Sequence, residues 1–72
     1  MKVTLKVEGM KCGMCEAKVN KLIRDVLPNA KKVKSNRNKG ISTFVADENS
    51  NIDEVVKNIT SNGYNVSGVE KA

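Results

Sequence analysis

Residues 2–26, KVTLKVEGMKCGMCEAKVNKLIRDV, decide the fold, because the spacing of their hydrophobic residues changes once along the segment. Over residues 2–8 hydrophobic and polar residues alternate, which predicts a half-buried strand. Over residues 15–26 the hydrophobic residues follow the spacing of an amphipathic helix instead. Pro28 ends this helix, because proline disfavours the helical conformation in the residue that precedes it.

A β-hairpin is predicted in the middle of the chain. Residues 31–37 form a weak strand whose only strongly hydrophobic residue is Val33, and residues 41–46 form the next strand. The turn between them, residues 38–40, has the composition Asn-Lys-Gly that suits a tight reversal. In the strand 41–46 we expect the β-branched side to face the core and Phe44 to be partly exposed. The residues on that expected core side are Ile41, Thr43 and Val45.

A second helix and a last strand complete the chain. Hydrophobic residues at helical spacing over residues 52–59 predict the helix, with Ser50 or Asn51 as its N-cap. The Asn-Gly pair at residues 62–63 should stop it. The last strand runs from Tyr64 to Glu70 and is anchored by Val66 and Val69.

The predicted order is βαββαβ, an α+β fold in which two helices cover one face of a four-stranded antiparallel sheet. No linker or low-complexity segment interrupts residues 1–72, so we expect a single domain. The start at Met1 and the end soon after the last strand favour a stand-alone protein over a module of a transporter. No hydrophobic run approaches the roughly 18 residues of a membrane helix, and the N-terminus does not resemble a signal peptide. We therefore expect a cytoplasmic protein without membrane insertion, whose thiols stay reduced.

The net charge of +5 is unevenly distributed along the chain. Residues 1–24 carry +4 and residues 25–47 carry +3, whereas residues 48–72 carry −2. This distribution fits a solvated surface, and it also fits docking to an acidic partner surface. The chain contains no histidine, which is the commonest general base, and we expect no enzyme.

Both cysteines lie in one short segment, GMKCGMC at residues 9–15, between the first strand and the first helix. Cys15 should fall in the first helical turn and Cys12 on the loop before it. Unpaired backbone N–H groups, the positive helix end and the charges of Lys11 and Lys18 should all lower the pKa of these thiols. The thiolate is the form that binds metal or attacks a disulfide.

Two thiolates without histidine suit a soft ion. Zinc normally takes four protein ligands, or three and a water. Cu(I) accepts thiolates at low coordination number, so two sulfurs can hold it and leave room for a third. A thiolate from another protein could then displace one of the first pair, which favours a carrier over a permanent structural site.

The segment GMKCGMC matches G-M-x-C-x-x-C, and the chain thereby resembles the heavy-metal-associated domain family over essentially its whole length. That family includes small bacterial copper chaperones and the metal-binding modules of copper-transporting P-type ATPases. The resemblance implies a ferredoxin-like fold, Cu(I) bound by Cys12 and Cys15, and delivery to a P-type ATPase or another copper acceptor. It also implies that Met10 packs beneath the loop and that Tyr64 lies near it. Ag(I) and Hg(II) suit two soft sulfurs as well, and Zn(II) stays an alternative.

The other residues of the segment have narrower expected roles. Gly13 should relieve backbone strain, Met14 should lie at the partner interface, and Tyr64 should cover the sulfurs. Lys11 and Met14 differ from the residues that are usual in the family. We expect a monomer without metal, with a metal-bridged dimer as an alternative once metal is bound.

Two other functions are open at this point. A C-x-x-C pair can serve a thiol–disulfide redox protein, although this chain is shorter than a thioredoxin-like fold requires and has no tryptophan. A basic βαββαβ chain can also bind RNA by stacking bases on aromatic residues of its sheet. Such proteins use aromatic residues of the first and third strands, and Phe44 is the only aromatic residue in these two strands of this chain. We therefore expect no nucleic-acid partner.

Overall fold

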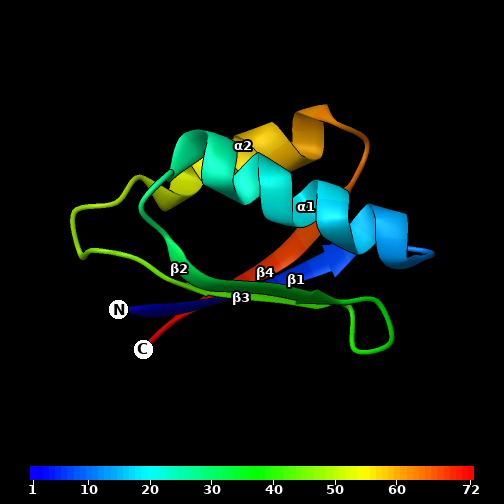
Figure 1. Ribbon diagram of the computed structural model, residues 1–72, viewed down its shortest axis with the longest axis horizontal. Helices are drawn as coiled ribbons and strands as arrows, with labels where there is room; N and C mark the ends of the chain where they lie inside the picture. Colours follow the sequence, from blue (N-terminus) through cyan, green and yellow to red (C-terminus); the bar gives the residue numbers. More distant parts are fainter.

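The computed structural model describes residues 1–72 and confirms the predicted βαββαβ order. Figure 1 shows the two helices side by side over one face of the sheet, while the other face is open. Neither helix combines the length and the hydrophobicity that crossing a membrane requires. The elements are β1 (Lys2–Glu8), α1 (Gly13–Val26), β2 (Lys31–Asn36), β3 (Ile41–Val45), α2 (Ile52–Ser61) and β4 (Asn65–Lys71).

The sheet has the strand order β2-β3-β1-β4, and every neighbouring pair is antiparallel. This order confirms the four-stranded antiparallel sheet of the ferredoxin-like fold. Strand β1 is central, and backbone hydrogen bonds between Lys2 and Ala72 tie the two chain ends together at one end of the sheet. The loop after β1 therefore leaves the sheet at the end opposite the chain termini (Figure 1).

The core lies between the sheet and the two helices, as the hydrophobic spacing predicts. The alternating hydrophobic residues of β1 are fully covered, because this central strand lies directly beneath both helices. Each helix buries one stripe against them, and Asn51, one of the two expected caps, accepts a 3.2 Å hydrogen bond from the backbone N–H of Glu54. The buried hydrophobic residues of these three elements are Val3, Leu5, Val7, Val19, Leu22, Ile23, Ile52, Val55 and Ile59.

The predicted facing of β3 is wrong, because Phe44 is only 1% exposed and packs in the core. Its strand pairs with β1 so that Phe44 lies opposite Val3 and Ser42 lies opposite Leu5. Directly paired residues share one face of a sheet, so the buried side of β1 determines the buried side of β3. The side expected to be buried, which includes Thr43, is the more exposed one.

Burial of Ser42 requires a hydrogen-bond partner, since an unpaired buried hydroxyl is costly. Its hydroxyl lies 2.8 Å from that of Ser35 on β2, which donates in turn to Asn20 Oδ1 on α1 at 2.6 Å. These bonds join the helix layer to the sheet without an unsatisfied polar group.

Only one of the two valines expected to anchor the last strand in the core does so. Val66 is half-buried, whereas Val69 is 43% exposed although it pairs with Leu5 in the core. Strand β4 forms an edge of the sheet, and its residues are therefore covered incompletely.

Candidate metal centre

The segment that carries the cysteines leaves β1 through a sharp reversal at Gly9. This glycine has a φ of +102°, in the left-handed region that side chains disfavour. A Cβ there would also lie 3.6 Å from Cδ1 of Tyr64, so the tyrosine ring packs directly over the start of the loop. Met10 follows and is buried in the core at 8% exposure, which fixes the loop from below.

The start of helix α1 brings the two cysteine sulfurs close together. Cys12 is the N-cap, and its carbonyl accepts hydrogen bonds from the backbone N–H groups of Cys15 at 3.1 Å and Glu16 at 3.2 Å. Cys15 thus lies in the first helical turn and Cys12 at its entrance, as the sequence predicts. Both thiols are free; Cys12 is exposed and Cys15 is half-buried.

The separation of the sulfurs suits a metal ion. Cys12 Sγ lies 4.0 Å from Cys15 Sγ, well beyond the ~2.05 Å of a disulfide bond. Two metal–sulfur bonds of about 2.3 Å, the length typical of zinc thiolates, would span that distance at an angle of about 120°. That angle leaves an open side for one more ligand. No group of three or more Cys, Asp or Glu side chains gathers around this or any other point.

The pKa of the Cys15 thiol is lowered from 9.0 to about 7. The largest cause is a hydrogen bond from the backbone N–H of Lys11, followed by one from the Tyr64 side chain. Burial opposes these effects, and the backbone and side chain of Cys12 add to them. The ammonium groups of Lys11 and Lys18 do not lower this pKa, contrary to the expectation from the sequence. Lys11 acts through its backbone N–H instead.

Tyr64 stands beside the cysteines because α2 ends just before it. Gly63 takes a left-handed φ of +93°, which turns the chain back toward the loop after β1. The hydrogen bond to Cys15 and the nearby sulfur charges raise the pKa of Tyr64, so its hydroxyl stays protonated and remains a donor. The tyrosine therefore places its ring over Gly9 and its hydroxyl close enough to Cys15 to lower the pKa of that thiol.

We expect the alkylation rate of Cys15 in the reduced, metal-free chain to reach half its maximum near pH 7. The thiolate is the reactive form, and the lowered pKa shifts its appearance to lower pH. Replacing Tyr64→Phe removes one of the hydrogen bonds and should move this midpoint to higher pH. Iodoacetamide labelling followed by fragmentation of the peptide 12–18 reports each cysteine separately. A wild-type midpoint near 9, or no shift in Tyr64→Phe, would contradict the account.

Gly13 and Met14 are the two residues between the cysteines, and the structure tests their expected roles separately. Gly13 has no left-handed backbone, so the expectation that it relieves strain is wrong. Met14 lies between the two cysteines in the sequence, and its side chain is 83% exposed. Lys11 and Lys18 are exposed around the same loop.

Two residues at the site are absent from the sequence-based prediction. Glu16 and Arg37 form an ion pair of 3.1 Å between the first turn of α1 and the tip of the β2–β3 hairpin. No local spacing connects them, because Arg37 follows β2 and reaches the helix only through the sheet pairing. Both side chains lie close to Gly13, so the guanidinium of Arg37 and the carboxylate of Glu16 lie beside the cysteine loop.

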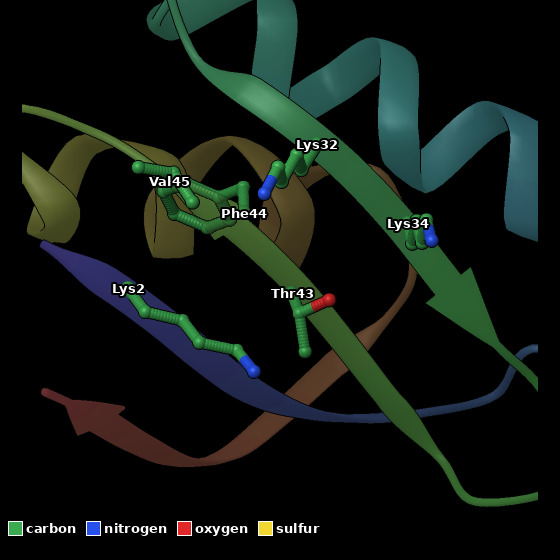
Figure 2. A pocket seen from close by; sticks show the side chains of 6 residues that line it. All are labelled: Lys2, Lys32, Lys34, Thr43, Phe44 and Val45. Atoms are coloured by element: carbon green, nitrogen blue, oxygen red, sulfur yellow. The ribbon is translucent and has the colours of Figure 1, made fainter.

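A separate hollow of about 210 Å³ lies on the open face of the sheet, with the helices behind it (Figure 2). Lys2 begins β1 and Cys12 follows its far end, so the hollow and the cysteine loop occupy opposite ends of the molecule. The chain has two aromatic residues: Phe44 is only 1% exposed, although it lines the hollow, and Tyr64 lies at the cysteine loop, so neither ring is exposed here for stacking bases. The hollow is lined by Lys2, Lys32, Lys34, Thr43, Phe44 and Val45.

Comparison with protein families matches the heavy-metal-associated domain over residues 4–65. Among solved structures, oxidized MerP from Ralstonia metallidurans CH34 is similar, with a TM-score of 0.81 and 26% identity over 99% of this chain and 97% of that one. The N-terminal domain of ZntA, solved in its Zn(II) form, has a TM-score of 0.82 and 25% identity over 99% and 93% of the two chains. The CopZ metallochaperone shares the fold, with a TM-score of 0.81 and 24% identity over 92% and 98%. Comparison with curated protein sequences finds no match.

Proposed function

The chain belongs to the heavy-metal-associated domain family, and from that premise we propose that it carries Cu(I) on the thiolates of Cys12 and Cys15. Its role is to hand the ion to an acceptor protein by exchange of thiolate ligands. The observation that carries this proposal is the pair of free sulfurs 4.0 Å apart at the start of α1. Residues 1–72 act as one metal-carrying domain in the reducing cytoplasm, and the chain is a carrier rather than an enzyme.

The preference for Cu(I) rests on the ligands that this chain offers. Two thiolates satisfy a soft monovalent ion, whereas a closed zinc site would require ligands from a second molecule. The related structures include a domain in its Zn(II) form, so family membership alone does not select the metal. Ag(I) and Hg(II) are further soft ions that the same two sulfurs would accept, with Zn(II) bound more weakly.

Exchange would proceed through the open side of the sulfur pair. A thiolate of the acceptor adds to the ion as a third ligand, and the bond to the exposed Cys12 then breaks. Cys15 is half-buried and less accessible to an incoming thiolate than Cys12, so we expect it to be the last ligand to leave. A second acceptor thiolate replaces it, and the ion has changed proteins without ever being free in water.

The acceptor we propose is a metal-transporting P-type ATPase or another copper-binding protein with an acidic surface around its own cysteines. Met14, which is 83% exposed, offers an apolar contact at the point of transfer. Lys11 and Lys18 are both exposed and lie within four residues of Met14 in the sequence, so they add positive charge near it. Lys21 is a weaker candidate because it pairs with Asp25 at 3.1 Å. The chain would stay a monomer without metal, and a metal-bridged dimer could form in the absence of an acceptor.

We expect reversal of the charges Lys11→Glu and Lys18→Glu to slow Cu(I) transfer to such an acceptor domain about tenfold at low salt, because charge steering governs encounter. Lys31→Glu, at the far end of the sheet, is the matched control and should transfer at the wild-type rate. Stopped-flow transfer measured over a range of salt tests this. Equal slowing in the control, or transfer rates independent of salt, would show that charge around the loop does not steer docking.

A further inference from the structure

Glu16 directly follows the candidate ligand Cys15 in the sequence. Its carboxylate makes two contacts with Arg37. Glu16 Oε2 accepts a 2.8 Å hydrogen bond from the backbone N–H of Arg37, and Oε1 lies 3.1 Å from its Nη1. The side chains are 23% and 43% exposed, so the carboxylate is the more enclosed partner. Figure 1 shows the β2–β3 hairpin and the start of α1 at the same end of the molecule.

This ion pair lies against the backbone that joins the two cysteines. A Cβ built on Gly13 would be 3.9 Å from Arg37 Nη1 and 3.9 Å from Glu16 Oε1. The cation and the carboxylate thus meet the cysteine loop at the same distance, and their charges compensate each other there. Without Arg37, the loop would face an uncompensated negative charge on the residue next to Cys15.

The effect of such a charge depends on the ion that is carried. Two thiolates and a monovalent ion make a complex of net charge −1, whereas two thiolates and a divalent ion make a neutral one. A nearby unpaired carboxylate repels the first complex and leaves the second nearly unaffected. Both ions bind to the same metal-free chain, so an unpaired carboxylate at Glu16 lowers the affinity for a monovalent ion relative to that for a divalent ion, whatever the protonation of the free thiols.

We propose that Arg37 is a specificity-determining residue of the metal site, which favours monovalent soft ions by neutralising Glu16 beside the cysteine loop. This inference rests on the proposed function and extends it to a residue of the distant β2–β3 hairpin. Arg37 acts through Glu16 and need not touch the ion.

Anaerobic competition titrations of the full chain with Cu(I) and with Zn(II) test this inference. Arg37→Ala should lower the ratio of Cu(I) affinity to Zn(II) affinity about fivefold, the upper range for an exposed charge pair. This change in the ratio should shrink in 1 M salt, where charges are screened within ~3 Å. Arg37→Lys keeps the cation and should lie between wild type and Arg37→Ala.

The double variant Glu16→Gln with Arg37→Ala separates charge from mechanical support. It removes both charges, so charge compensation predicts a ratio of Cu(I) to Zn(II) affinity within about twofold of wild type, whereas loss of a mechanical clamp would leave the ratio as in Arg37→Ala. Asp25→Asn breaks the exposed pair with Lys21, away from the loop, and serves as the control with unchanged affinity.

Two results would overturn the role of Arg37: an unchanged ratio of Cu(I) to Zn(II) affinity in Arg37→Ala, as an equal loss for both ions would give, or no recovery of the ratio in the double variant. A wild-type chain that does not bind Cu(I) would instead overturn the proposed function, and the inference with it. The wild-type titration alone therefore distinguishes the two failures.

Discussion

Replacing either Cys12→Ser or Cys15→Ser is expected to lower Cu(I) affinity by about 100- to 1000-fold. Structural zinc sites with four ligands bind with about 10–16 kcal/mol, or roughly 2.5–4 kcal/mol for each ligand. A serine hydroxyl stays protonated near neutral pH and cannot replace a thiolate. With two candidate ligands in the chain, loss of one leaves a single sulfur, and competition against a Cu(I) chelator measures the difference.

Met14→Ala is the matched control for these serine variants. Met14 lies between the two cysteines in the sequence, but its side chain is 83% exposed, so its removal should leave the two sulfurs in place. We expect Cu(I) affinity within about threefold of wild type, since a thioether is a much weaker ligand than a thiolate. A double serine variant that binds Cu(I) as tightly as wild type would show that the ion is held elsewhere.

Phe44→Ala is expected to cost about 3–5 kcal/mol of unfolding free energy, the usual range for removing a buried phenylalanine. The ring is 1% exposed and lies opposite Val3 on the central strand. A loss of this size is a large share of the roughly 5–15 kcal/mol that stabilises a typical protein. Urea denaturation followed by circular dichroism measures it.

Thr43→Ala on the open face controls for the loss of strand propensity. We expect it to cost less than about 1 kcal/mol, because its side chain lies on the more exposed side of β3. Comparable losses in the two variants would mean that the ring contributes little to the core, contrary to the structure.

The elements that local spacing determines could be predicted from the sequence. The alternation in β1 and the helical stripes of α1 and α2 each have one hydrophobic side, so their buried faces are unambiguous. Strand β3 carries hydrophobic residues on both sides, and only its register with β1 shows that Phe44 faces the helices. The same limit applies to Val69, whose exposure depends on the edge position of β4.

In the candidate site, too, the residues of one local segment could be predicted, and those brought together by packing alone could not. Cys12 and Cys15 could be predicted because one strand–loop–helix segment carries both, and the helix start fixes their separation. The place of Tyr64 beside them follows from the resemblance to the family and from the βαββαβ order, which brings the end of the second helix to the same end of the fold as the cysteine loop. Arg37 could not be predicted, because its contact with Glu16 depends on how the hairpin packs against α1.

Anaerobic titration of the reduced chain with Cu(I) and Zn(II) against competing chelators tests the central claim most directly. The account predicts that one Cu(I) binds each chain far more tightly than Zn(II), and that alkylation of Cys12 and Cys15 abolishes this binding. Equal or tighter binding of Zn(II), or a full equivalent of Cu(I) bound by the alkylated chain, would contradict it.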